Sequence, residues 1–288
     1  MDWITLSILS AASLGFYEIS RKLSLQKVPA LNVLWLSIII SGLLAAPFAF
    51  QSTVIPLEAH LWILIKSAII CLSWAGEFFA LKQIPLSIGM AVRSTGPFFT
   101  TLVAVFFFRE MPSTIEWTGI SLVLAGYFNF IFLARFHKHT GTLRYRWLML
   151  IFLATLLGTF SSGIDRHILK ALSVPPLTFL VWFSIYIAIL TSLPMIILLT
   201  NKVTSVKRSD FVWAIPLISI LLIFSDWFYY TALANIDSSL SVVSALRRGA
   251  LIISVLGGVV IFREGKFINK MTAICFVFSG IAILKLFG

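Results

Sequence analysis

Five ionisable side chains interrupt long apolar stretches of this sequence. They are three arginines and two acids: Arg93, Arg247, Arg248, Glu77 and Asp226. An ionisable group in hydrocarbon costs about 2.5–3.5 kcal/mol on insertion scales, so it normally faces a cavity or a partner. These five positions are therefore the first candidates for binding chemistry.

Arg93 and Arg247 hold equivalent positions in two similar stretches. Each precedes the glutamate of an Arg-Glu pair, Glu110 or Glu264, by the same interval. At about 1.5 Å per helical residue, both arginines lie roughly 10–13 Å into their apolar runs. The spacing thus predicts two related charged positions deep inside the protein.

The charges allow two hypotheses. In the first, Glu77–Arg93 and Asp226–Arg247 are buried ion pairs that only hold helices in register, and Arg248 is left without an acidic partner. In the second, the three arginines bind an anionic part of a substrate. The guanidinium fork matches the geometry of carboxylates and phosphates, which favours the second hypothesis.

Aromatic side chains lie close to both acids in the sequence. They are Trp74, Phe78 and Phe79 in one stretch, and Trp227, Phe228, Tyr229 and Tyr230 in the other. Trp74, Trp227 and Tyr230 could form a cage for a cation, with Glu77 and Asp226 as its counter-charges. Ordinary packing or lipid contact explains the same residues equally simply, so the cationic substrate stays an alternative.

Lipid must surround the elements that position these residues. The hydrophobic fraction is 59% and the charged fraction is 11%, whereas soluble domains have about 45–50% apolar and about 25% charged residues. Continuous apolar runs of about 20 residues predict transmembrane helices and not barrel strands. The ten runs are roughly 3–20, 31–50, 61–81, 86–108, 115–134, 147–164, 177–200, 211–233, 239–262 and 267–287.

The ten runs divide into two related halves. Phe108-Arg109-Glu110 ends run four and Phe262-Arg263-Glu264 ends run nine, while Val28-Pro29 and Val174-Pro175 precede runs two and seven. We expect a first five-helix repeat at 1–134, a basic linker at 135–146 and a second repeat at 147–288. Five spans per half is an odd number, so the second repeat enters from the opposite side, as in many secondary transporters.

This pattern resembles the drug/metabolite transporter (DMT) superfamily, and within it the ten-helix EamA-type carriers. The signature residues are Pro97, Phe108-Arg109-Glu110, Trp117, Gly119 and Gly126, then Phe262-Arg263-Glu264 and Gly280. Leu251 stands where the second copy would have its proline. The resemblance implies a carrier of a small organic metabolite, with runs five and ten outside the central cavity. Arg93 with Arg247-Arg248 is similar to the phosphate-binding arrangement of the superfamily's organophosphate translocators.

Other polar residues at helix ends could form a gate or could simply be solvated. They are Tyr17, Glu18 and Arg21 in run one, then Asp165, Arg166 and His167 in run six. Lys66, near the expected start of run three, is interpreted as a snorkelling side chain. The histidines have no acid or nucleophile at useful spacing, and no nucleotide loop or metal motif is present, so we expect neither an enzyme nor a cofactor or metal.

The expected partners are a small solute, the bilayer and a coupling ion. The net charge is +11, but most Lys and Arg lie in short connectors, where they orient helices and contact lipid phosphates, so no nucleic acid is expected. A flippase for a lipid-linked precursor is a further alternative. The basic connectors predict cytoplasmic loops with both termini outside, although relatives generally have cytoplasmic termini. We expect a multi-pass protein of a bacterial inner membrane.

Overall fold

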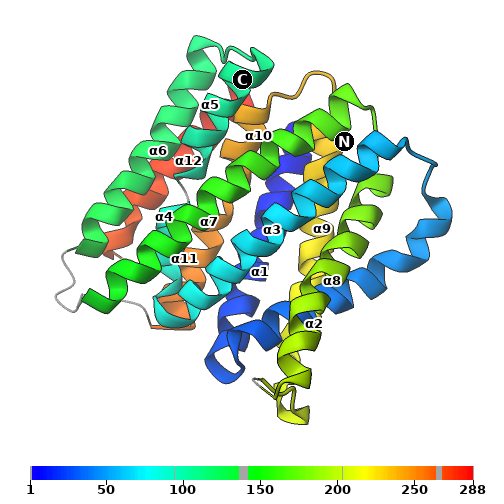
Figure 1. The fold of residues 1–288 in the computed structure, drawn as a ribbon. Coiled ribbons are helices and arrows are strands. Elements are labelled where there is room, and N and C mark those ends of the chain that lie inside the picture. The colour runs from blue at the N-terminus through cyan, green and yellow to red at the C-terminus, as the bar shows by residue number, and fades with distance from the viewer. Residues whose placement is uncertain (1, 94, 136–141, 203, 264–267, 288) are drawn as a thin grey trace.

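The protein is a bundle of helices (Figure 1). The computed structural model describes residues 2–287 except 94, 136–141, 203 and 264–267, and all regular elements in these ranges are helical. The first half contains α1 (Trp3–Lys27), α2 (Ala30–Ala45) continued by η1 (Ala46–Gln51), α3 (Leu57–Gln83), α4 (Leu86–Arg93), α5 (Gly96–Phe108) and α6 (Thr114–Arg135). The second half contains α7 (Thr142–Arg166) continued by η2 (His167–Ala171), α8 (Pro176–Thr200), η3 (Arg208–Asp210), α9 (Ala214–Ala234), α10 (Leu240–Arg247), α11 (Ala250–Val260) and α12 (Ile268–Phe287).

Six helical stretches of the described chain are long and apolar enough to cross a bilayer. They are Ala30–Gln51, Leu57–Gln83, Tyr145–Ala171, Pro176–Thr200, Ala214–Ala234 and Leu240–Val260. Large apolar side chains are exposed outside the bundle, whereas charged side chains such as Glu18, Arg21 and Lys66 are buried within it. This inversion of the soluble pattern fits a lipid environment, and the protein is an integral membrane protein.

Runs four and nine are not the continuous helices that the sequence predicted. The first is interrupted between α4 and α5, directly after Arg93, and the second between α10 and α11, directly after Arg247. Pro97 explains the first break, because its ring conflicts with the carbonyl of Arg93 four residues earlier. In the second, the amides of Arg248 and Gly249 bond to carbonyls only three residues back, at 3.1 and 2.9 Å.

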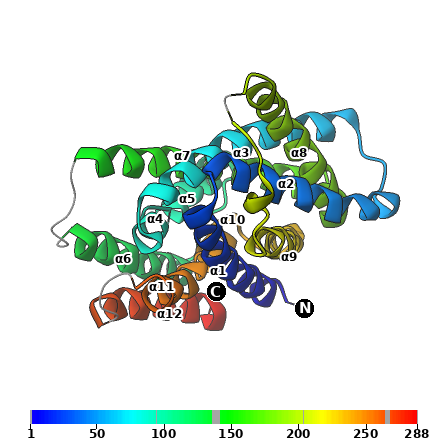
Figure 2. The same ribbon diagram turned by 90° about the horizontal axis from the view of Figure 1, so that it is seen from below.

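Helices of the two halves contact each other in matched combinations. The α1–α9 contact has its counterpart in α3–α7, and the α4–α11 contact has its counterpart in α5–α10. The α2–α8 and α6–α12 contacts each join corresponding helices. The pair α6–α12 forms one flank of the bundle (Figures 1 and 2). Its backbones approach closely, since a Cβ on Gly280 would lie 2.6 Å from the carbonyl oxygen of Gly119.

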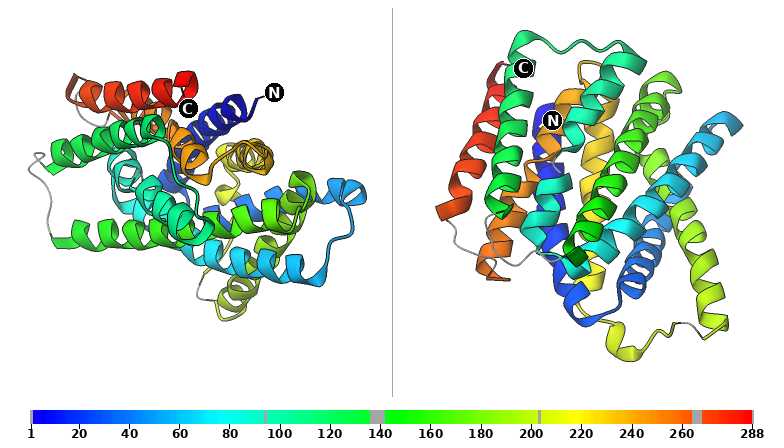
Figure 3. Two further views of the ribbon diagram at one scale, coloured as in Figure 1. Left: turned by 90° about the horizontal axis from the view of Figure 1, so that it is seen from above. Right: turned by 60° about the vertical axis from the view of Figure 1, so that its left-hand side comes forward.

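The two ends of the bundle differ in what they carry. The N- and C-termini lie at one end, here called the termini end (Figures 1 and 3). Helix α6 ends and α7 begins at the opposite end, here called the linker end. Helix α1 runs between the two ends through the middle of the bundle and packs against α9, α10 and α11.

Candidate functional site

A cavity of about 100 Å³ lies among the helices. Its lining comes mostly from middle turns of α1, α3, α7, α8 and α9, and from the ends of α4 and α10 at the two interruptions. Among the described residues, none of the lining residues belongs to α6 or α12. The charged side chains of the lining are Lys66, Glu77, Arg93, Asp165, Asp226, Arg247 and Arg248.

The structure brings most of the expected site residues to this one cavity. Those that line it are Trp74, Glu77, Arg93, Asp226, Tyr230, Arg247 and Arg248. Trp227 is outside the lining: its side chain is 43% exposed and stacks on Phe228 with 6.0 Å between ring centres. On α9, Asp226 and Tyr230 lie one turn apart on the cavity face, and Trp227 is rotated away from that face.

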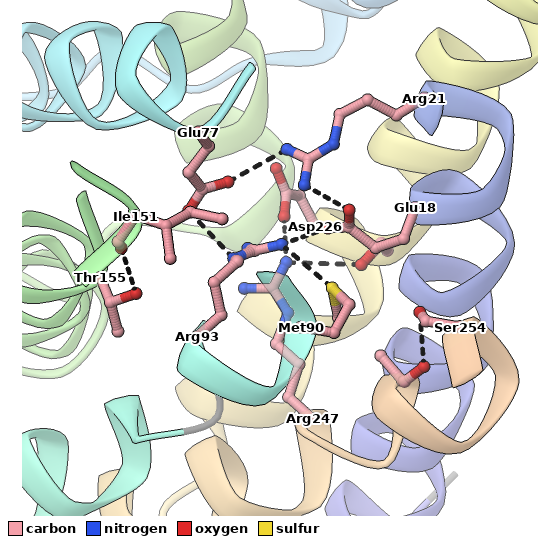
Figure 4. A network of polar contacts seen from close by, with 12 residues as sticks. Glu18, Arg21, Glu77, Met90, Arg93, Ile151, Thr155, Asp226, Arg247 and Ser254 are labelled. Atoms are coloured by element: carbon pink, nitrogen blue, oxygen red, sulfur yellow. Dashed lines mark hydrogen bonds and ion pairs between the residues drawn. The ribbon is translucent and has the colours of Figure 1, made fainter. Parts of the chain in front are cut away.

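Four buried charges form a closed network, here called the four-charge ring (Figure 4). Its members are Glu18 and Arg21 of α1, Glu77 of α3 and Arg93 of α4. Each carboxylate contacts both arginines; Glu77 lies 3.0 Å from Arg21 Nη1 and 3.0 Å from Arg93 Nε. The ring is neutral overall, which offsets the high cost of burying each charge.

The interpretation of Glu18 and Arg21 as solvated helix-end residues is wrong. Both side chains have 0% exposure, because α1 continues to Lys27 and keeps them inside the bundle. The guanidinium of Arg21 also lies 5.2 Å from the centre of the Tyr17 ring and 5.0 Å from that of Phe78. The expected pair Glu77–Arg93 is thus present, but as half of a larger network.

The second expected pair, Asp226–Arg247, is also present. Arg247 Nη2 lies 2.5 Å from Asp226 Oδ1, and its guanidinium lies 4.2 Å from the centre of the Tyr229 ring. Arg248 is not left over, because it too has an interaction partner. Its guanidinium occupies space beside Gly96, where a Cβ would lie 2.6 Å from Nη2.

Lys66 is a cavity residue and not a snorkelling one. Its exposure is 3%, and its Nζ lies 2.5 Å from Asp165 Oδ1 and donates a 3.2 Å hydrogen bond to Ser161 Oγ. Three rings surround the ammonium, with centres at 4.4 Å (Phe183), 5.5 Å (Phe179) and 5.5 Å (Tyr230). The sequence-based interpretation of Lys66 was wrong because the helix was expected to begin at residue 61. It begins at Leu57, so Lys66 lies in the third turn of α3.

The Phe-Arg-Glu motif terminates one helix and caps another. Arg109 has a left-handed conformation, with φ 55°, that ends α5, and Arg263, with φ 53°, lies just beyond the end of α11. Glu110 accepts hydrogen bonds from Arg166 Nε at 2.5 Å and from the amide of Leu240 at 2.9 Å, at the start of α10. Its sequence counterpart, Glu264, lies outside the described residues. The carboxylate therefore ties α5, α7 and α10 together at the termini end.

Lysines stabilise helix ends at both faces of the bundle. Lys22 of α1 donates to the carbonyls of Leu81 and Ile84 at 2.5 and 2.6 Å, at the end of α3. Lys170 of η2 donates to the carbonyls of Ile236 and Ser238 at 3.2 and 2.6 Å, just after α9. Of the remaining expected gate residues, Tyr17 and Asp165 line the cavity, while the ring of His167 lies 5.1 Å from that of Trp62.

Known proteins resemble this chain in fold and, over part of its length, in sequence. A solved structure described only as "Crystal structure of protein" matches with a TM-score of 0.69 and 19% identity, over 96% of each chain. No curated protein matches this sequence. The model of the EamA-like transporter family matches residues 1–132, the first of the two halves. The first half of the chain is therefore similar to this transporter family.

Proposed function

We propose that this protein is a secondary carrier of a small organic solute that bears a carboxylate or phosphate. The observation that carries the proposal is the charge of the cavity. Among the described lining residues, four are cations, Lys66, Arg93, Arg247 and Arg248, and three are carboxylates, Glu77, Asp165 and Asp226. An excess of positive charge in an apolar bundle favours an anionic ligand, and guanidinium groups offer it paired donors.

Alternating access by two inverted five-helix repeats, 1–134 and 147–288, is the mechanism we propose. The matched contacts between the halves support it. So do the interruptions after Arg93 and Arg247, because discontinuous helices at the interface of inverted repeats are typical of substrate sites in secondary transporters. In this mechanism the two repeats rock around the cavity. The solute crosses the membrane between the two interrupted helices, which carry Arg93 and Arg247. The membrane we propose is a bacterial inner membrane.

The alternative hypothesis, a cationic solute, has less support. Of the three expected cage residues, Trp227 lies outside the cavity lining, and Tyr230 contacts the ammonium of Lys66 instead, together with Phe179 and Phe183. Asp226 and Glu77, the acids assigned to such a solute, are occupied by arginines. A cation would have to displace these internal partners, whereas an anion would add to the existing excess of positive charge.

A ligand screen on the purified protein tests the proposal. We expect carboxylates and phosphate esters to raise the Tm in detergent, and cations and neutral sugars to leave it unchanged. Counterflow in proteoliposomes, in which internal unlabelled solute drives entry of labelled solute, then separates carriers from channels. Stabilisation by cations alone would overturn the anion proposal. Stimulation by lipid-linked anions, with no transport of water-soluble ones, would favour the flippase alternative.

A further inference from the structure

Asp165 and Lys66 form the one ion pair among the described cavity residues in which both partners can exchange a proton. The other carboxylates of the lining, Glu77 and Asp226, pair with arginines. A guanidinium does not lose its proton in proteins, whereas the charge of a lysine responds to its surroundings. Proton exchange in this cavity is therefore most favourable at Asp165–Lys66.

The carboxylate of Asp165 is held less firmly than the other acids. Lys66 Nζ lies 2.5 Å from Asp165 Oδ1, but the contact is not aligned as a hydrogen bond, and Oδ1 has no hydrogen-bond partner. Glu77, by contrast, contacts two guanidinium groups. The Asp165–Lys66 pair is held by charge attraction at close contact, so one proton from the aqueous phase can bind the carboxylate without breaking an aligned hydrogen bond.

Three aromatic rings and one hydroxyl group would still contact the ammonium of Lys66 when Asp165 is neutral. The rings of Phe179, Phe183 and Tyr230 present their faces to it, and Ser161 accepts one of its protons. Cation–π contacts of this kind compensate for part of the attraction that the neutralised carboxylate no longer supplies. Protonation of Asp165 would then leave Lys66 as an additional available positive charge beside the cavity.

Other charged and titratable groups near Asp165 largely offset one another. The other charged groups that act on Asp165 are Asp226 of α9, which repels its carboxylate, and Arg247 of α10, which attracts it. These two groups are themselves paired at 2.5 Å. Tyr229 and Tyr230 of α9 are buried phenols that remain neutral neighbours. Lys66 of α3 is therefore the principal charged partner of the buried Asp165 carboxylate.

We infer that Asp165 is the proton-coupling site, at which uptake of one proton releases Lys66 to bind the anionic group of the solute. The inference rests on the proposed function and names its coupling ion. Proton and anion then enter the cavity together, and each raises the affinity for the other by the same factor, because linkage is reciprocal. The carrier would thus be driven by a proton gradient in symport with the anion.

Sulfate is a suitable probe, because its charge is constant between about pH 5 and about pH 8, where a carboxyl can titrate. Binding is followed through fluorescence of Trp74, which lines the cavity. We expect the wild type to bind sulfate about tenfold more tightly at the lower pH, a typical coupling magnitude. In Asp165→Asn, which mimics the protonated acid, binding should be tight at both pH values. The matched control, Asp237→Asn, changes an exposed residue outside the cavity and should behave as wild type.

Infrared difference spectra give a readout that does not depend on any solute. Acidification should produce a protonated-carboxyl band in the wild type that Asp165→Asn lacks and Asp237→Asn retains. If Asp165→Asn fails to fold because Lys66 is left buried without a counter-charge, the neutral double variant Lys66→Gln with Asp165→Asn replaces it. That double variant should lose both the band and the pH dependence of binding.

The outcomes separate the inference from the proposed function. If sulfate binds and its pH dependence persists in Asp165→Asn and in the double variant, the coupling site is wrong and the anion carrier stands. If no anion binds at either pH although the Asp165 band is present, the proposed function is wrong and coupling falls with it. Loss of pH dependence together with the band supports the inference.

Discussion

Arginine dominates the charged interior of this protein because one guanidinium can satisfy several acceptors at once. Arg21 and Arg93 share two carboxylates, and Arg247 joins a carboxylate to an aromatic ring. Arg248 lies at the cavity in a space that exists only because residue 96 is glycine. Gly96 is therefore a means of moving Arg248 without removing its charge.

Gly96→Ala should weaken anion binding about tenfold with little loss of stability. The new Cβ would lie 2.6 Å from Arg248 Nη2, so the guanidinium must shift. Because the obstructed atom is the end of a flexible side chain, the fold can adapt, and alanine is also the better helix former. Thermal shift without ligand measures stability, and sulfate titration measures binding.

Gly76→Ala is the matched control for this change. Its Cβ would lie 3.3 Å from Leu150 Cδ1, 3.5 Å from Leu150 Cγ and 3.6 Å from Ala154 Cβ, and Gly76 is not among the lining residues. This variant should bind sulfate as the wild type does. Unchanged binding in Gly96→Ala would show that the position of Arg248 is not important for the anion.

The sequence predicted single charged residues better than their networks. Ion pairs Glu77–Arg93 and Asp226–Arg247 formed one of the two hypotheses drawn from depth and spacing, and both contacts are present. The roles of Glu18 and Lys66 were missed, since each lies near the estimated boundary of an apolar run, where solvation and burial look alike. Three-dimensional partners, and not local hydropathy, decide which of these charges are buried.

Packing of the helices depends on glycines where two backbones meet. The clearest case is α6–α12, where Gly280 contacts the backbone of Gly119 and Val123. Apolar periodicity alone could not predict this contact, because the hydropathy of both helices is nearly uniform. The helix interruptions were missed for the same reason: α4–α5 and α10–α11 read as continuous apolar runs.

Gly280→Ala should destabilise the protein and leave the affinity for sulfate unchanged. The added methyl would lie 2.6 Å from the Gly119 carbonyl oxygen and 2.9 Å from the Val123 amide nitrogen, and backbone atoms cannot easily move. Overpacking of this kind typically costs about 1–3 kcal/mol. Binding should persist because no described lining residue belongs to α6 or α12.

Thermal unfolding in detergent, with and without sulfate, measures both effects. Gly158→Ala in α7 provides the comparison for stability, since its Cβ would have only Ser73 Oγ within 4 Å, at 3.9 Å. It should be neutral or slightly stabilising. Equal Tm values for Gly280→Ala and Gly158→Ala would contradict close packing of α6 on α12.

Across the whole molecule, the two halves do not carry the same charges at corresponding positions. Alignment of Ala80-Leu81 with Ala232-Leu233 places Tyr229 opposite Glu77, and alignment of Arg21 with Arg166 places Gly163 opposite Glu18. Two arginines are retained, but both carboxylates of the four-charge ring are missing from the second half. The linker side of the cavity is therefore held by a closed ring of four charges, whereas the equivalent arginines of the second half, Arg166 and Arg247, pair separately with Glu110 and Asp226.

This asymmetry predicts that the linker side is the more firmly closed. Glu18→Gln should weaken the ring and raise access to the cavity from that side about tenfold. Access is measured on Ser162→Cys, a lining position, in a Cys71→Ser, Cys275→Ser background, as the rate of reaction with an impermeant maleimide. The control is Glu116→Gln, which lies at the start of α6 and outside the lining. An unchanged rate from the linker side would contradict a closing role for the ring.

The orientation of the protein decides whether the more firmly closed side of the cavity faces the cytoplasm. We predict this orientation from the basic residues. Most Lys and Arg of the connectors belong to the linker end, and positive-inside bias then places that end in the cytoplasm. Arg21 and Lys22 do not count toward this bias, because they are 0% and 9% exposed and contact protein groups. The excess of basic residues at the linker end remains without these two, because the connectors 135–146 and 201–210 are themselves rich in Lys and Arg.

A cysteine added after Gly288 in the cysteine-free background tests the orientation directly. We expect an impermeant maleimide to label it on intact cells, because the termini end would face outward. Thr140→Cys, in the linker, is the matched probe and should react only after permeabilisation. The reverse pattern would put both termini in the cytoplasm, as is general among relatives. The termini side, which is the less firmly closed one, would then face the cytoplasm. The resting carrier would take up its solute from the cytoplasm, as an exporter does.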